Sequence, residues 1–180
     1  MKRVILAPAA LSPAALDELK QWLGISVTAE DALLAALLRA ALDLCEAFTG
    51  TMPLAASCEE VLPASAEWQG LSTRPVIAIT AIEGIPAEGA RYTLAPSDYE
   101  FDFAADGSGL VRVRRQGSAG RVAVRFEAGM AASWEDLPEA IRQGAIRLAA
   151  HHYRERDGAA ASPPAAVAAL WQPWRRLRIA

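Results

Sequence analysis

The chain has 180 residues, of which 53% are hydrophobic and 22% are charged, and its formal net charge at pH 7 is −3. This length suits one domain or a domain with an insertion, and the composition supports a folded core and excludes a disordered chain. The balanced charge excludes a broadly basic nucleic-acid coat, and because no run of 18 or more apolar residues occurs, we expect no membrane contact.

The N-terminal segment, residues 1–11, is predicted to be a short extended arm. Its opening letters have the look of a secretory signal, but Pro8 interrupts the apolar run and a helix-start signal follows at Ser12-Pro13. A signal sequence needs about 7–15 uninterrupted apolar residues. The segment therefore lacks the pattern of a signal.

Two helices are predicted next, and they form a helical hairpin over residues 12–50. Ser12 and Pro13 provide the cap and the first-turn proline of the first helix, and Gly24 ends it. The second helix opens with acidic residues, which the helix dipole favours at that end. Its apolar stripe is broad enough to contact more than one neighbour, and it consists of Leu33, Leu34, Leu37, Leu38, Ala41, Leu44, Cys45 and Phe48.

The middle of the chain changes to a period of two, which predicts a small antiparallel β-sheet over residues 57–129. Because apolar and charged residues alternate along most strands, we expect one apolar and one charged face. Tyr99, Phe101 and Phe103 are expected on the core-facing side. The predicted strands are residues 76–82, 92–94, 99–103, 111–113 and 122–126, with hairpin turns at Gly107, Gly109, Gly117 and Gly120.

Helix returns in the last part of the chain. A long helix is predicted over residues 134–157, and residues 158–180 contain a linker, a short helix from Ala165 to about Trp171, and a tail. The order of helices, sheet and helices predicts an α+β fold. In it, an α-helical bundle of two N-terminal helices, one long and one short C-terminal helix carries the antiparallel β-sheet as an insertion.

The chemistry-bearing residues form no catalytic or metal-binding motif. His151 and His152 are adjacent, so on a helix they point about 100° apart, and no two histidines have the i, i+4 spacing of a helical zinc pair. His152 also falls on the apolar face, which favours a packed or interface histidine over a ligand. Cys45 and Cys58 are too few for a disulfide framework and favour a reducing, intracellular setting. We therefore expect no enzyme, no metal and no cofactor.

The charged face of the predicted sheet has two interpretations. Cross-strand ion pairs explain its acids and its arginines together, although each exposed pair contributes only ~0–1 kcal/mol. Alternatively, the arginines track nucleic-acid phosphates. No exposed aromatic is predicted between them, which argues against a base-stacking platform. The residues of this face are Glu100, Asp102, Arg112, Arg114, Arg121 and Arg125.

The end of the chain gathers tryptophan and arginine. Both residue types are enriched among the residues that dominate binding interfaces. Alternatively, the two tryptophans fold back onto their own helical bundle, and both roles are compatible if the tail spans subunits. We predict partner contact for Trp171, Trp174, Arg175, Arg176 and Arg178.

In their order and spacing, several short motifs resemble those of phage head–tail connector (adaptor) proteins, which are also described as possible DNA-packaging proteins. The resemblance covers residues 12–178, although the loop after Gly50 departs from it and residues 55–73 match little. The motifs are Leu16-x-x-Leu19-Lys20-x-x-Leu23, Glu30-Asp31-Ala32-Leu33-Leu34, Thr49-Gly50, Pro75-Val76, Asp98-Tyr99, Val122-x-Val124-x-Phe126-x-Ala128-Gly129, Leu137-Pro138-x-Ala140-Ile141-Arg142, His151-His152-Tyr153, and Ala166-Val167-x-x-Leu170 with Trp174-Arg175.

The resemblance implies a structural role in the neck of a virion. A homo-oligomeric ring, a dodecamer in the virion, is expected beneath the portal protein, where it extends the DNA channel and docks a stopper or tail-terminator protein. Genomic DNA is expected to pass through without sequence-specific binding, and assembly is expected in the host cytoplasm. The tail residues are then expected to contact the portal or a neighbouring subunit, and His151, His152 and Tyr153 to lie at a subunit interface.

Two other functions stay open. One is another phage head-completion, stopper or tail-completion protein of similar build. The other is a nucleic-acid-binding module that uses the arginine-bearing sheet face. A ring needs two different complementary faces on each subunit. The acidic residues 1–90 and the basic residues 91–180 are one hypothesis for these faces.

Overall fold

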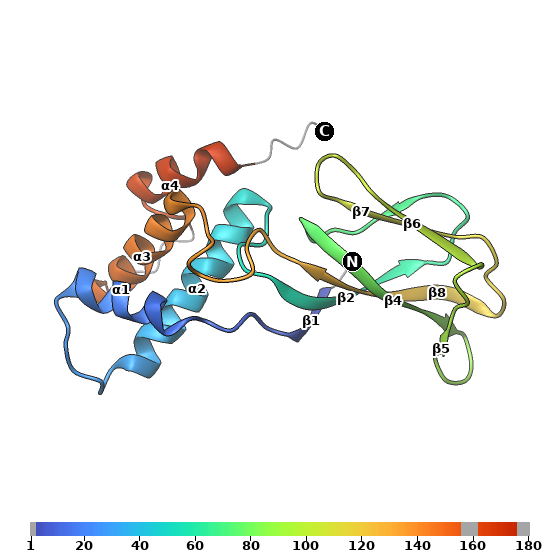
Figure 1. Ribbon diagram of the computed structural model, residues 1–180, viewed down its shortest axis with the longest axis horizontal. Helices are drawn as coiled ribbons and strands as arrows, with labels where there is room; N and C mark the ends of the chain where they lie inside the picture. Colours follow the sequence, from blue (N-terminus) through green and yellow to red (C-terminus); the bar gives the residue numbers. More distant parts are fainter. Residues whose placement is uncertain (1–2, 156–161, 176–180) are drawn as a thin grey trace. The chain divides into compact units, whose positions relative to one another are not determined.

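The computed structural model of the protein describes residues 3–155 and 162–175, and the chain divides into two compact units (Figure 1). The helical unit is built from residues 10–54 and 131–180, and the sheet unit from residues 1–9 and 55–130. The chain therefore crosses between the units three times. As predicted, the fold is α+β.

Among its described residues, the helical unit contains four α-helices, which are labelled in Figure 1, and α3 contacts each of the other three. No helix in the described part of the chain has both the length and the hydropathy needed to cross a bilayer. The helices are α1 (Pro13–Leu23), α2 (Asp31–Thr49), α3 (Glu139–Arg154) and α4 (Ala165–Trp171), and a 3₁₀ turn (Gln172–Trp174) follows α4.

Local chemistry sets the ends of α1 and α2 close to where the sequence predicts them. Ser12 Oγ accepts a hydrogen bond from the backbone N–H of Ala14, and Pro13 occupies the first turn, where its missing N–H costs little. Gly24 and Gly50 follow the two helices with φ angles of 72° and 73°. Glycine enters this left-handed region without a steric penalty, so both residues end their helices cleanly.

The long helix begins later than predicted, at Glu139 rather than at residue 134. Pro138 has φ −52° and ψ 136°, which is extended geometry, and a proline also disfavours helical geometry in the residue before it. The residues before it form turns, in which the buried Trp134 donates its Nε1–H to the Glu18 carboxylate over 3.2 Å. The predicted end of the helix at residue 157 lies outside the described part of the chain.

The core of the helical unit is formed mainly by α2 and α3. Leu34, Leu38 and Cys45 are fully buried along one side of α2, as predicted. Leu33, which we expected to widen this stripe, is exposed instead. Burial raises the pKa of the Cys45 thiol to about 12, so this cysteine behaves as a small apolar side chain.

A tryptophan of α4 completes this core. Trp171 is fully buried, its Nε1–H donates to the backbone carbonyl of Ile141 over 3.3 Å, and its ring centroid lies 6.1 Å from that of Phe48. The indole fits because Gly144 of α3 has no side chain. A Cβ at that position would lie 2.1 Å from the indole nitrogen.

In residues 3–9 and 55–130, the sheet unit contains two antiparallel sheets rather than the single small sheet that we predicted. The five-stranded sheet has the order β1-β2-β8-β4-β5, and the three-stranded sheet has the order β3-β7-β6. Figure 1 labels these strands except β3. The strands are β1 (Arg3–Ala7), β2 (Ala56–Pro63), β3 (Gln69–Gly70), β4 (Val76–Pro86), β5 (Tyr92–Thr93), β6 (Tyr99–Phe103), β7 (Gly109–Val113) and β8 (Ala119–Ala128).

The predicted N-terminal arm is extended, but it is also a strand of the larger sheet. Arg3 of β1 lies opposite Glu60 of β2, and Ile5 lies opposite Cys58. β2 in turn pairs with β8 along its whole length. Residues 55–63, which matched no motif of the resemblance, therefore supply a strand that lies inside the sheet.

The aromatic residues of β6 are placed differently from our expectation. Phe101 lies opposite the buried Val111 of β7, so its side chain is on the predicted face of the sheet. However, β6 is an edge strand, and Phe101 and Phe103 are both exposed. Their rings contact each other with centroids 5.9 Å apart. The period of two predicted the face correctly, but not how far the edge of the sheet is covered.

A buried carboxylate fixes a loop of the sheet unit. Glu60 of β2 is fully buried, and its carboxylate accepts four hydrogen bonds from two consecutive residues. The donors are the backbone N–H and the hydroxyl of Ser72 and of Thr73, at distances of 2.6 to 2.9 Å. A buried charge is tolerated when it is hydrogen-bonded in this way, so Glu60 holds the loop between β3 and β4 in place.

Candidate functional site

The structure divides the predicted partner-binding tail into a buried and an exposed part. Trp171 belongs to the core of the helical unit, so its assignment as a partner contact is corrected: burial leaves it no surface to offer. Trp174 is 37% exposed and Arg175 is exposed, and their role in partner binding stays a prediction. Arg176 and Arg178 lie outside the described residues.

The exposed part of the tail lies against the end of α2. The guanidinium carbon of Arg175 is 5.2 Å from the centroid of the Phe48 ring. A cation over an aromatic face is attracted by the ring quadrupole, and this contact positions the Arg175 side chain on the helical unit. Trp174 precedes it in the chain, so an aromatic and a cationic side chain follow one another at this surface.

The histidine pair lies near the end of α3. The ring centroids of His151 and His152 are 5.9 Å apart, and His151 Nε2 lies 3.2 Å from the Glu155 carboxylate. Tyr153 donates its hydroxyl to Glu30 over 2.6 Å, which ties α3 to the start of α2. Among the described residues, no group of three or more His, Cys, Asp or Glu side chains is arranged to hold a metal ion. The interface role of these three residues stays a prediction.

An exposed tryptophan of α1 separates two depressions on the helical unit. Trp22 is 45% exposed, and the guanidinium carbon of Arg147 from α3 lies 5.5 Å from its ring centroid. Both depressions are lined in part by Trp22. Trp22 is thus an exposed aromatic side chain beside an arginine, and both residue types are enriched in protein–protein interfaces.

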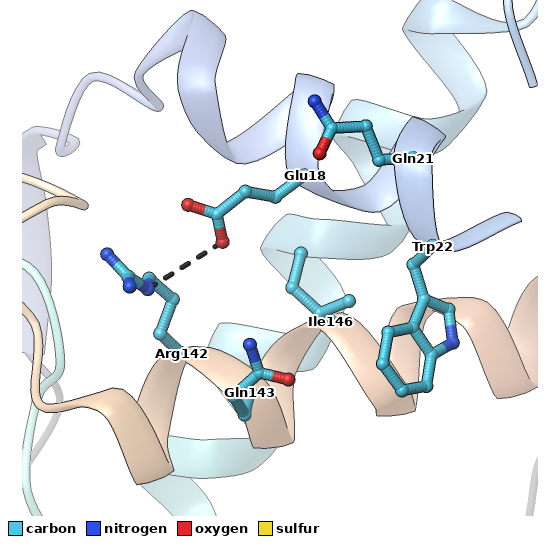
Figure 2. A pocket seen from close by; sticks show the side chains of 6 residues that line it. All are labelled: Glu18, Gln21, Trp22, Arg142, Gln143 and Ile146. Atoms are coloured by element: carbon cyan, nitrogen blue, oxygen red, sulfur yellow. Dashed lines mark ion pairs between the residues drawn. The ribbon is translucent and has the colours of Figure 1, made fainter. Parts of the chain in front are cut away.

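Figure 2 shows the first depression, which has a volume of about 360 Å³. Arg142 Nε and Glu18 Oε2 lie across it at 3.6 Å, which is an ion pair but too long for a hydrogen bond. The Arg142 Nε atom is buried and has no hydrogen-bond partner, whereas another nitrogen of the same side chain pairs with Glu139. The lining residues are Glu18, Gln21 and Trp22 from α1 and Arg142, Gln143 and Ile146 from α3.

The second depression, of about 280 Å³, lies between α1, α3 and the start of α4. It contains His151, one of the predicted interface residues, together with two arginines and an acid. Its lining residues are Trp22, Arg147, His151, Arg154, Glu155, Pro164, Ala166 and Val167.

The arginines of the sheet unit are mostly paired with acids. Arg112 and Arg114 both form ion pairs with Glu100, as the cross-strand interpretation predicts. Arg125 lies between two carboxylates, those of Glu59 at 3.2 Å and Glu83 at 3.3 Å. Four arginines were predicted on the charged face of the sheet. Among the described residues, Arg121 is the one of these four that has no acidic partner.

Two of these acids and two arginines form a small network on one face of the five-stranded sheet. Glu59 accepts hydrogen bonds from Arg91 at 2.9 Å and from Arg125 at 3.2 Å. Burial by itself would raise the pKa of Glu59, but these hydrogen bonds and the two positive charges outweigh it and hold the pKa below its ordinary value of 4.5. The arginines on this face therefore serve the fold, at least in part.

One exposed aromatic does lie among the arginines, contrary to our expectation. Trp68, in the loop before β3, is 40% exposed, and the guanidinium carbon of Arg112 lies 4.6 Å from its ring centroid. The same guanidinium pairs with Glu100. Trp68 is therefore covered on one face by a neutralised arginine, which makes it a poor base-stacking platform.

Sequence reasoning missed two of the exposed tryptophans, Trp22 and Trp68. The sequence places Trp22 near the end of a predicted helix, between Leu19 and Leu23. Whether its ring is buried depends on a neighbouring segment that the local sequence does not reveal. Trp68 had no periodic signal, because it lies in a stretch, residues 64–73, that has neither helical nor strand alternation. In both cases exposure depends on contacts between distant segments.

The comparisons with known proteins confirm the resemblance to head–tail connectors. Residues 13–82 match the sequence model of the family described as phage gp6-like head-tail connector protein. No curated protein sequence matches the chain. The matched region covers α1, α2, β2, β3 and the first part of β4, so it includes residues of both units.

Solved structures match over nearly the whole chain. One is a chain from the neck of an empty gene transfer agent (GTA) particle computed with C6 symmetry, with a TM-score of 0.79 and 28% identity; the match covers 100% of this chain and 98% of that one. Another, from the virion of a native GTA particle, has a TM-score of 0.74 and 29% identity and covers 100% and 98%. A third, from the neck of a native GTA particle computed with C12 symmetry, has a TM-score of 0.74 and 28% identity and covers 98% and 97%.

Proposed function

We propose that this protein is a structural, non-enzymatic head–tail connector of a tailed phage or a phage-like particle. Copies of the chain form a closed ring, a dodecamer, beneath the portal protein, and the ring extends the channel through which the genome passes. Its other side docks a stopper or tail-terminator protein. Assembly takes place in the host cytoplasm, and the mature protein lies in the neck of the virion.

The observation that carries this proposal is the full-length structural match to a neck protein. The match covers 100% of this chain and 98% of the GTA neck chain, so no large domain of either protein lacks a counterpart in the other. Related neck assemblies with C6 and C12 symmetry support a cyclic ring of copies. The connector-family match over residues 13–82 supports the same role from the sequence alone.

The ring requires two different faces on each subunit, because a cyclic interface repeats head to tail until it closes. The earlier hypothesis, in which an acidic first half meets a basic second half, does not follow the architecture, because each unit takes residues from both halves. We assign the portal or subunit contact instead to the exposed part of the tail, Trp174 and Arg175, together with Arg176 and Arg178. His151, which lines the second depression, is proposed to lie at a subunit interface together with His152 and Tyr153.

The proposal is tested by changing Arg175, Arg176 and Arg178 together to alanine. Portal and connector are mixed, and complexes are counted by negative-stain imaging and by co-purification. We expect the triple variant to lose most of its portal binding because the positive charge of the tail is removed. A ring that forms on the portal as well as the wild type does would refute the role of the tail.

A control variant removes the same charge elsewhere. Arg39, Arg115 and Arg121 are all exposed, and changing them to alanine alters the net charge by the same amount. We expect this variant to bind the portal normally. Equal loss in both variants would mean that net charge, rather than the tail, governs docking.

A nucleic-acid-binding module is the second candidate, and the observation that favours it is the exposed Trp68 beside Arg112. Non-specific DNA binding weakens steeply as salt increases, in proportion to the number of phosphates that are neutralised. Because Glu100 pairs with both Arg112 and Arg114, we expect little DNA retention at low salt. Strong, salt-dependent retention that disappears in the Trp68→Ala variant would favour this second function over the connector.

A further inference from the structure

The five-stranded sheet has two open edges. β1 forms one edge and pairs only with β2. At the other end, β5 pairs with just two residues of β4, Glu83 and Gly84. Within the described part of the chain, no strand therefore lies on the outer side of residues 77–81 of β4. Each open edge presents backbone N–H and C=O groups that are suited to pairing with another strand.

Both edges carry exposed apolar side chains. Val4, Ile5 and Leu6 of β1 are 54%, 42% and 48% exposed, and Ile77 of β4 is 52% exposed. Proteins commonly protect an edge strand with proline, lysine or an inward-pointing charge. β1 has a single irregularity in its register, between Ile5 and Ala7, and its exposed centre is wholly apolar. Such a strand is typical of an edge that is covered in the assembled protein.

The two edges are complementary in direction and in length. Each neighbouring pair in β1-β2-β8-β4 is antiparallel, so β1 and β4 run in opposite directions within one copy. If a second copy with the same orientation is placed beside the first, its β1 lies antiparallel to β4. The β1 strand of the second copy would then lie on the same side of β4 as β5. β1 has five residues, and the uncovered stretch 77–81 has the same length, with register shifts between Val76 and Ala78 and between Ile79 and Ala81 that make it less regular than β1.

We propose that β1 of one copy pairs with residues 77–81 of β4 in the neighbouring copy, so that the five-stranded sheets join edge to edge around the ring. This inference rests on the proposed ring. It names the two different faces that a head-to-tail interface needs, and both are strand edges. The occupant of each edge is a second copy of this chain, because related chains form necks with cyclic symmetry and the opposite ends of one sheet match each other.

Cross-linking between engineered cysteines tests the pairing. Val4 and Thr80 are both exposed and lie opposite each other when residues 3–7 run antiparallel to residues 77–81, whereas the native Cys45 and Cys58 are fully buried and leave the background low. The full-length variant carrying Val4→Cys and Thr80→Cys is assembled, alone or on its portal, and treated with a short bis-maleimide. We expect a ladder of covalent oligomers on a denaturing gel, because each copy offers one cysteine to each neighbour.

Three controls separate this interface from others. Val4→Cys alone and Thr80→Cys alone are each expected to give no more dimer than the wild type. Efficient dimer formation by Val4→Cys alone would show β1-to-β1 pairing and overturn the inference. The matched double variant Val4→Cys with Leu33→Cys keeps one edge and moves the second cysteine to an exposed site on α2. A ladder of equal strength from this variant would show random collision.

The outcomes also distinguish this inference from the proposed function. If negative-stain imaging shows rings but the Val4/Thr80 double variant gives no ladder, the edge pairing is wrong and the connector function stands. If no ring forms with or without the portal, the proposed function fails and the inference fails with it. As a second measurement, Val4→Lys is expected to raise the concentration for half-assembly by about tenfold or more without changing the melting temperature. Leu33→Lys is the control, and normal assembly of Val4→Lys would also overturn the pairing.

Discussion

Changing Glu60 to glutamine tests whether the buried carboxylate holds the sheet unit together. The carboxylate accepts four hydrogen bonds, three at Oε1 and one at Oε2, all from Ser72 and Thr73. The oxygen of a glutamine can replace Oε1, but its NH₂ group would then face the N–H of Ser72. The charge-assisted hydrogen bond from the Ser72 N–H is then lost, and two buried donors oppose each other. The other three hydrogen bonds are made to a neutral amide oxygen instead of a charged carboxylate.

The size of the effect follows from the value of such bonds. Hydrogen bonds to charged groups contribute ~1.5–3 kcal/mol, and a buried unsatisfied donor costs ~1–3 kcal/mol. Because removal of a buried charge offsets part of this, we expect a loss of about 2–3 kcal/mol in the free energy of unfolding of the sheet unit. That loss corresponds to an increase of about 30- to 160-fold in the population of the open state.

Thiol labelling measures this population in each unit separately. Cys58 is fully buried in the sheet unit and Cys45 is fully buried in the helical unit, so each reacts with a maleimide only when its surroundings open. Mass spectrometry of the peptides then gives the two rates independently. In the Glu60→Gln variant we expect Cys58 to be labelled about 30 times faster or more, with Cys45 nearly unchanged.

The control for this experiment is Glu100→Gln, which removes an acid of the same unit from a partly exposed ion pair. Exposed pairs contribute ~0–1 kcal/mol, so Cys58 labelling should rise by less than about fivefold. If the Glu60 variant labels Cys58 no faster than the Glu100 variant, the buried carboxylate does not stabilise the unit and the reasoning is refuted.

Two further predictions concern packing and pH. Gly144→Ala should lower the melting temperature by several degrees, because the new Cβ would lie 2.1 Å from the Trp171 indole nitrogen. Overpacking of this kind costs ~1–3 kcal/mol. The control is Gly120→Ala, which has no atom within 4 Å of its Cβ position and should melt at the wild-type temperature. The pKa of Glu59 is lower in the folded protein than its ordinary value of 4.5, so its contribution is present above that pH and is lost as the pH falls below it. Urea unfolding at several pH values should therefore show a decline in stability below pH 4.5 that is shallower in Glu59→Gln, and equal slopes for both proteins would contradict this assignment.

The parts of the fold that depend on local chemistry were predictable from the sequence. Ser12, Gly24 and Gly50 end their helices through interactions with residues four or fewer positions away, so a short window of sequence contains the cause. The same applies to the cross-strand pair of Arg112 and Glu100, because an alternating pattern specifies the face of each strand.

The missing parts depend on contacts between distant segments. β2 contains two consecutive acids, which obscure its strand pattern, and Glu60 is acceptable inside the protein only because Ser72 and Thr73 return to meet it. The burial of Trp171 likewise depends on Gly144, 27 residues earlier in the chain. A single sequence shows each of these residues but not that they meet.

The candidate site was predicted only in its residue types. Tryptophan and arginine near the C-terminus indicated a contact surface, but the structure leaves Trp174 at the surface and assigns Trp171 to the core. Trp22 and the apolar edge of β1 were not predicted, because exposure is decided by which side chains the rest of the fold leaves uncovered.

The three crossings of the chain between the two units limit how the protein can be taken apart. A fragment covering residues 55–130 would lack β1 and leave β2 at the margin of its sheet, and residues 10–54 alone would lack α3 and α4. No uninterrupted piece of the gene therefore encodes either unit without residues of the other. A single protease cut at any one crossing would still leave the remaining two connections intact, so a nicked protein would keep its two units tethered.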